Sequence, residues 1–210
     1  MDTIPVHKYK QNGSSLIELL IASFIGIIAI SLVGSIFING QRVAKNRGLE
    51  LLLAQNLTST MQIIKEDIQR AGYDGADGQS VKLSAAANII EITPNSIAFV
   101  YHRYGLSVNS NIVKTYQNII YIYSPSEHSL KICEQETFMT DIKTMDTIDE
   151  CDNLFDDNNI KVTAFNVTKT PLITSSATSS IIDIQLDIEL VNIPTMKKGL
   201  SFNVKQRNWL

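Results

Sequence analysis

Apolar residues are concentrated in one long run near the start of the chain. Residues 16–38 contain 23 positions, of which only Glu18 is charged. About 20 consecutive apolar residues suffice for a helix to cross a bilayer, whereas the apolar core of a secretory signal has roughly 7 to 15. The pattern therefore predicts a membrane-spanning helix over residues 14–40 and argues against an ordinary secretory signal.

A second, amphipathic pattern follows over residues 41–72. Its apolar residues recur every three or four positions, which places them on one face of a helix: Leu49, Leu53, Leu57, Met61, Ile64 and Ile68. We expect this segment to continue the first helix without a break and to pack its apolar face onto the rest of the protein. The helix should end near Gly72, because Gly75 and Gly78 follow closely and glycines favour the end of a helix and a turn after it.

Residues 73–210 change to the two-residue period of β-strands. Residues 181–191 alternate aliphatic with acidic or amide side chains, the pattern of a half-buried strand. A hairpin turn is expected at Pro125. Shorter strand candidates lie at 97–102, 119–123, 130–133, 162–168 and 200–205. The sequence thus predicts an α+β protein with a long N-terminal helix packed on an antiparallel β-sheet head.

The two cysteines of the chain, Cys133 and Cys151, both lie in this head. Seventeen residues separate them, and closing such a loop by a disulfide is worth about 3 kcal/mol in loop-entropy terms. Disulfides persist in oxidising compartments, so this pairing favours a head outside the cytoplasm. The alternative is a pair of reduced cysteines in a cytosolic head.

The sequence KYKQNGSSLIELL, residues 8–20, immediately precedes and opens the apolar run. It resembles the prepilin cleavage motif in Gly13, Leu16, Ile17 and Glu18. The resemblance implies that a prepilin peptidase removes a leader of residues 1–13 by cutting after Gly13, and that it methylates the new N-terminal amine of Ser14. Ser14 departs from the family pattern, in which phenylalanine or methionine is usual at that position.

Glu18 is also unusual on physical grounds. A carboxylate at the centre of a membrane-spanning helix costs about 2.5 to 3.5 kcal/mol and less near the interface, so such a residue is a functional candidate. Together with Leu16 and Ile17 it would form an assembly site, in which Glu18 of an incoming subunit pairs with the Ser14 amine of a neighbour. Alternatively, Glu18 lies among the lipid headgroups, where an acid near a helix N-terminus is favoured by the helix dipole.

The head carries little that points to catalysis. His102 and His128 have no flanking nucleophile or metal motif, and the glycine-rich and nucleophile-elbow patterns of enzymes are not found. An acidic run over residues 141–157 either binds calcium or forms a solvated loop. Removing Asp2, Lys8 and Lys10 with the leader changes the formal net charge from -3 to -4, which disfavours nucleic-acid binding. We therefore expect a protein that is not an enzyme and that has no cofactor, no resident metal and no nucleic-acid partner.

The sequence DIQRAGYDG, residues 67–75, is similar to the end of the first helix in the PilW family of minor pilins. That resemblance implies a non-catalytic minor type IV pilin that helps initiate pilus assembly. Its implied partners are other minor pilins, the major pilin, the prepilin peptidase and an inner-membrane assembly platform. The protein would be anchored by one inner-membrane span with its head, residues 73–210, in the periplasm, and would later reach the pilus at the cell surface. The alternatives are a minor pseudopilin of type II secretion, a single-pass membrane-anchored binding module and an envelope enzyme.

Overall fold

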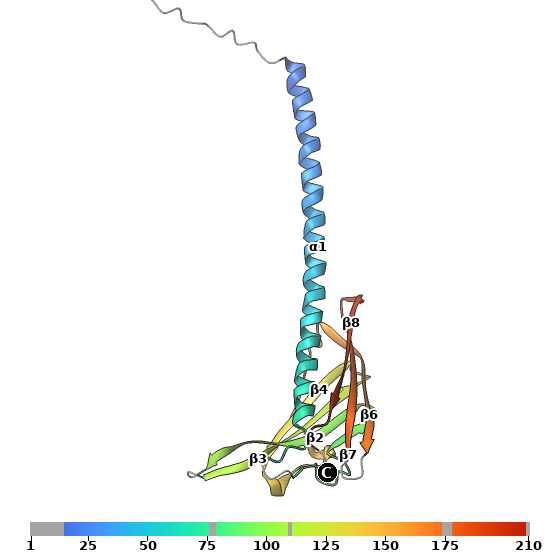
Figure 1. The fold of residues 1–210 in the computed structure, drawn as a ribbon. Coiled ribbons are helices and arrows are strands. Elements are labelled where there is room, and N and C mark those ends of the chain that lie inside the picture. Colours follow the sequence, from blue (N-terminus) through green and yellow to red (C-terminus); the bar gives the residue numbers. More distant parts are fainter. Residues whose placement is uncertain (1–14, 76–78, 109–110, 174–177, 209–210) are drawn as a thin grey trace, which may run out of the picture. The chain divides into compact units, whose positions relative to one another are not determined.

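The computed structural model describes residues 15–75, 79–108, 111–173 and 178–208. A single helix, α1 (Leu16–Arg70, 55 residues), precedes all the strands (Figure 1). The chain divides into two compact units between Leu49 and Glu50. The first unit contains the apolar part of α1, and the second contains the remainder of α1 together with every described strand.

The strands form two antiparallel sheets, whereas the sequence led us to expect one (Figure 1). The larger sheet has five strands in the order of the sequence: β1 (Ile90–Thr93), β2 (Ser96–Val108), β3 (Asn111–Ser124), β4 (Ser129–Thr137) and β5 (Cys151–Asn153). The smaller sheet consists of β6 (Ile160–Ile173), β7 (Thr178–Leu190) and β8 (Ile193–Lys205). Two short 3-10 helices, η1 (Met139–Asp141) and η2 (Met145–Thr147), lie between β4 and β5. The expected hairpin turn at Pro125 joins β3 to β4.

The amphipathic part of α1 supplies the core of the second unit, as its spacing predicted. Five of the six predicted residues are buried: Leu53, Leu57, Met61, Ile64 and Ile68. The sixth, Leu49, is only half-buried and is the last residue of the first unit. A separate hydrophobic cluster contains residues from β2, β3 and β4 and from the segments before β1 and after η2. Its buried members are Val81, Leu83, Ala98, Val100, Tyr116, Ile120, Cys133 and Ile148.

Strand β7 shows the alternation that its sequence predicted. Its five inward side chains are buried: Ile182, Ile184, Leu186, Ile188 and Leu190. The residues between them are exposed or half-buried. Because β7 is the central strand and pairs with both β6 and β8, one face of this sheet belongs to the core and the other is polar.

Gly72 ends the helix and starts the connection to the sheet. Its φ of +79° is left-handed, and a Cβ there would lie 2.5 Å from a side-chain carbon of Ile89. Only glycine satisfies both conditions without strain. The Gly72 N–H donates to the Val100 carbonyl at 2.8 Å, and the His102 N–H donates to the Tyr73 carbonyl at 2.6 Å. The chain leaving α1 is therefore bonded directly to β2.

Candidate functional site

The first turn of α1 carries the candidate assembly residues. Leu16, Ile17 and Glu18 are exposed, with Leu16 at 76% and Ile17 at 63% of their full accessibility. The Glu18 carboxylate accepts the backbone N–H of Ser15 at 3.0 Å, so it caps its own helix. The predicted cleavage residues, Gly13 and Ser14, lie outside the described residues. The structure thus places Glu18 where the dipole of α1 favours a negative charge.

The large apolar side chains of α1 between Leu16 and Ile38 are all exposed. The helix contains a window long and apolar enough to cross a membrane, and none of that window is buried in the protein. The Ser31 hydroxyl donates to the Ile27 carbonyl at 2.8 Å, so this polar group is satisfied within the helix and can lie in lipid. This part of α1 is consistent with single-pass membrane anchoring.

At the other end of α1, a buried carboxylate joins the helix to the five-stranded sheet. Asp67 is only 5% exposed, although it carries a formal charge in a hydrophobic setting. It accepts hydrogen bonds from Tyr121 on β3 at 2.6 Å and from Tyr101 on β2 at 3.2 Å. An Arg70 nitrogen lies 3.6 Å from the same carboxylate, and the Arg70 guanidinium stands 5.5 Å from the centre of the Tyr101 ring. We call these four residues the Asp67 cluster.

Burial dominates the electrostatics of the Asp67 cluster. It raises the pKa of Asp67 above its ordinary value, and the hydrogen bond from Tyr121 and the charge of Arg70 oppose that rise. Burial and the neighbouring Asp67 carboxylate raise the pKa of Tyr101 to about 12 and that of Tyr121 still further. Both tyrosines are therefore neutral donors at physiological pH. The cluster joins the end of α1 to β2 and β3 through the hydrogen bonds from Tyr101 and Tyr121 to Asp67.

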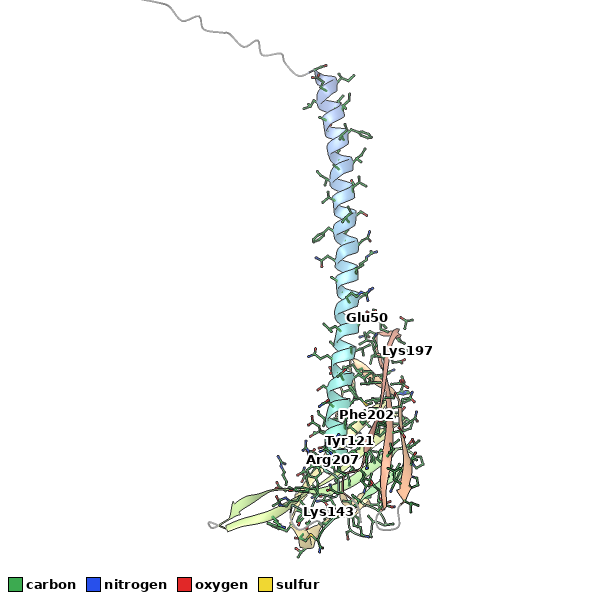
Figure 2. The ribbon with its side chains drawn as sticks, in the orientation of Figure 1. Glu50, Tyr121, Lys143, Lys197, Phe202 and Arg207 are labelled. Atoms are coloured by element: carbon green, nitrogen blue, oxygen red, sulfur yellow. A yellow bond between two sulfur atoms is a disulfide. The ribbon has the colours of Figure 1, made fainter. Side chains whose placement is uncertain are left out.

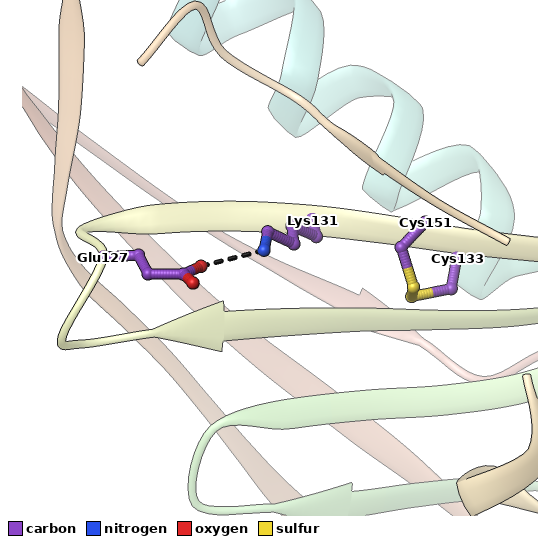
Figure 3. Close-up of a disulfide and its surroundings, with 4 residues drawn as sticks. All are labelled: Glu127, Lys131, Cys133 and Cys151. Atoms are coloured by element: carbon purple, nitrogen blue, oxygen red, sulfur yellow. Dashed lines mark hydrogen bonds and ion pairs between the residues drawn. A yellow bond between two sulfur atoms is a disulfide. The ribbon is translucent and has the colours of Figure 1, made fainter. Parts of the chain in front are cut away.

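A disulfide joins Cys133 to Cys151, which are paired directly across β4 and β5 (Figure 3). Cys133 is fully buried in the second hydrophobic cluster, whereas Cys151 is exposed. The bond closes the segment that contains η1 and η2 against that cluster. Figure 3 also shows the ion pair between Glu127 and Lys131, 2.8 Å long, at the start of the same strand.

The other candidate groups of the sequence are spread over the surface. The acidic residues of the 141–157 run are exposed, and Asp156 accepts the Asn158 N–H within its own turn. Among the residues that the structure describes, no group of three or more His, Cys, Asp or Glu is placed to hold a metal. Four basic residues near the end of the chain are close in sequence: Lys197, Lys198, Lys205 and Arg207. Lys197 and Arg207 nevertheless lie at different ends of the β8 region (Figure 2). These residues do not form a single basic patch.

The chain thus has an α+β architecture in which a long helix with one candidate membrane span is followed by antiparallel sheets. Residues 47–206 match the family described as PpdB, prepilin peptidase-dependent protein B. Because the match covers more than half of the chain, the chain belongs to this family. The matched region begins after the apolar run, so the assignment is independent of the motif at residues 8–20. No curated protein and no solved structure matches the chain.

Membership of this family makes the protein prepilin peptidase-dependent and pilin-like, and such proteins are typically structural and not catalytic. Sequence reasoning missed the Asp67 cluster, although a signal was available. Asp67 stands three residues after Ile64 and immediately before Ile68, on the apolar face of the helix. An acid at such a position needs hydrogen-bond donors from the opposing surface, which here are two tyrosines.

Proposed function

We propose that the chain is the precursor of a minor type IV pilin that helps initiate pilus assembly as a structural subunit. The observation that carries this proposal is the exposed apolar part of α1 joined to a head of the prepilin peptidase-dependent protein B family. An apolar surface of this size requires lipid or other apolar helices around it. Both environments are available in turn to a subunit that is first anchored in the inner membrane and later packed into a filament.

The peptidase cuts after Gly13 in this proposal, removes residues 1–13 and exposes the amine of Ser14 for methylation. Glu18 then has two roles. One carboxylate oxygen caps its own helix through the Ser15 N–H. The other oxygen has no hydrogen-bond partner within the described residues, and it accepts the positive Ser14 amine of a neighbouring subunit. In a low-dielectric environment this pairing offsets the cost of placing either charge in lipid alone.

The head lies in the periplasm in this proposal, a location supported by its disulfide. Its partners are other minor pilins, the major pilin and the inner-membrane assembly platform. The similarity of residues 67–75 to the PilW family supports a place among the minor pilins. In this chain that segment contains Asp67, which is bonded to the sheet, and Gly72, which ends the helix.

The mass of the intact protein, extracted from membranes with and without a co-expressed prepilin peptidase, tests the processing step. The expected result is a peptidase-dependent loss of residues 1–13, with or without a methyl group on Ser14. A Gly13→Leu variant should remain uncut under the same conditions. An unaltered chain in the presence of an active peptidase would contradict the proposal and favour a membrane-anchored binding module.

A Glu18→Ala substitution separates processing from assembly. The variant should be cut normally but should be depleted in sheared pili relative to the membrane pool, because its carboxylate can no longer pair with a neighbouring amine. Glu66→Ala is the matched control, since Glu66 is an exposed acid on the same helix within the second unit. Normal incorporation of the Glu18→Ala chain would rule out the pairing.

A further inference from the structure

The outward face of the three-stranded sheet carries a shallow hollow that the assembly role does not use. Its volume is about 400 Å³, within the range of small-molecule sites. Six outward side chains from all three strands line it: Asn166, Thr168, Asp183, Gln185, Ser201 and Asn203. Ile184 and Phe202 also border the hollow, although the Ile184 side chain is buried and the Phe202 ring lies 5.9 Å from the Lys65 amine of α1. We call this feature the β6–β8 hollow.

The strand register brings these six residues together in two rows. Gln185 on β7 is paired with Asn166 on β6 and with Ser201 on β8. In the next row, Asp183 is paired with Thr168 and Asn203. Neighbouring Cβ atoms in such rows are about 4.5 to 5.5 Å apart. The six side chains can therefore reach a single ligand, and their positions are fixed by a continuous hydrogen-bonded ladder.

The side chains of the β6–β8 hollow have unused hydrogen-bonding capacity. In the described parts of the chain, only Gln185 has a side-chain partner, the carboxylate of Asp187 at 2.8 Å. The side chains of Asn166, Asp183 and Asn203 make no hydrogen bond there. Five of the six lining side chains are short, so fixing them against a ligand costs little conformational entropy compared with lysine or glutamate. The hollow therefore presents preformed donors and acceptors.

A second hollow of about 350 Å³ adjoins the first along β7 and is lined by Thr163, Asp187, Lys197, Lys198 and Gly199. Gly199 is paired with Asp187, and a side chain at Gly199 would collide with the Asp187 carboxylate. The bare backbone of Gly199 keeps this part of the face open. Residues 183–189 extend for about 20 Å at roughly 3.4 Å per residue. The two hollows together form a polar surface long enough for several units of an extended ligand.

We propose that the β6–β8 hollow binds a neutral carbohydrate chain. Sugar hydroxyls both donate and accept, and the lining matches them with a carboxylate that accepts, amides that do both and hydroxyls that do both. Asp183 is the one charged side chain among the residues that line the β6–β8 hollow, and its carboxylate disfavours an anionic ligand such as a nucleic acid there. A docked peptide helix would need an apolar groove, and the side chains that line the hollow are polar. This inference is independent of the assembly proposal.

The test uses the full chain in a detergent without a sugar headgroup and three neutral probes: cellohexaose, maltohexaose and chitohexaose. Titration calorimetry or saturation-transfer NMR should detect binding of at least one probe. Asp183→Asn should weaken that binding about tenfold or more, because hydrogen bonds to charged groups are the strongest that the hollow offers. The Asn166→Ala/Asn203→Ala double variant should weaken it similarly.

Asn192→Ala is the matched control, because Asn192 is an exposed amide in the turn between β7 and β8 and lies outside the hollow. It should bind the probe as the wild type does, and circular dichroism should show the same fold for all variants. The proposal is overturned if no probe binds at about 10 mM, a concentration that detects even millimolar affinities. It is also overturned if the hollow variants bind as tightly as the wild type, or if a neutral glycine-serine hexapeptide binds at the hollow and the sugars do not.

Discussion

Replacing Tyr121 by phenylalanine tests whether the Asp67 cluster holds α1 to the sheet through a charged hydrogen bond. The substitution keeps the ring, which is fully buried, and removes only the hydroxyl that lies 2.6 Å from the Asp67 carboxylate. A hydrogen bond to a charged group contributes about 1.5 to 3 kcal/mol. Tyr101 still donates to the other carboxylate oxygen at 3.2 Å, so the carboxylate keeps one neutral donor. We expect a loss of about 2 kcal/mol in the free energy of unfolding at pH 7.

The same variant should respond to pH in a defined direction. Burial raises the pKa of Asp67 above 3.8, and the Tyr121 hydrogen bond opposes that rise by stabilising the ionised form. Between pH 3.8 and this raised pKa, Asp67 is therefore protonated to a greater extent in the folded protein than in the unfolded chain. The contribution of Asp67 to stability is greatest below pH 3.8 and falls as the pH rises through its folded-state pKa. The cost of Tyr121→Phe should be smaller below that pKa, where Asp67 is protonated, than at pH 7.

Urea unfolding of the full chain in a neutral detergent, followed by near-ultraviolet circular dichroism at pH 7 and at a pH just below 3.8, measures both effects. Tyr73→Phe is the control, since Tyr73 is 49% exposed and its hydroxyl makes no hydrogen bond within the described residues. Asp67→Asn should remove the contribution of this acid to the pH dependence. A Tyr121→Phe loss below about 0.5 kcal/mol, the usual range for surface substitutions, or an equal loss at both pH values, would refute the reasoning.

Three further experiments probe the second unit by substitution. Gly72→Ala should destabilise it by about 2 to 4 kcal/mol, from left-handed strain and overpacking together, as measured by the urea midpoint. The Cys133→Ser/Cys151→Ser double variant should lose about 3 kcal/mol, and reducing the wild type should lower its thermal midpoint to a similar extent. Ile64→Ala should cost about 2 to 5 kcal/mol by leaving a cavity, whereas Ile63→Ala, at 44% exposure, should change the unfolding free energy by less than about 1 kcal/mol. Equal effects at these two neighbouring positions would contradict the assigned face of α1.

Elements with a long periodic pattern could be predicted from sequence. The span and the amphipathic part of α1 repeat one pattern over many turns, and β7 alternates over most of its length. Strands β1 and β5 escaped prediction because they have only four and three residues, too few to establish a period. Their positions depend on pairing with β2 and β4, which is long-range information. The division into two sheets depends on such pairing as well.

The candidate site was predictable only in part. Glu18 can be identified from sequence because it is the single charged residue in an apolar run. The disulfide could be predicted because the chain has only two cysteines. The two tyrosines that donate to Asp67 are 34 and 54 residues away in sequence, so no local pattern connects them to it. The same holds for the β6–β8 hollow, whose six side chains come from three strands. The sequence around each of these residues does not distinguish it from other surface residues, and only the strand register shows that the six are neighbours.

The link between Cys133 and Cys151 also affects how the protein responds to proteolysis. The segment that it closes is acidic and largely exposed between Phe138 and Glu150, and exposed loops are preferred sites of cleavage. A single cut there leaves both fragments joined through the sulfur atoms. Such a nicked head would migrate as an intact chain without reductant and as two pieces with it, so damage at this surface need not release any part of the subunit.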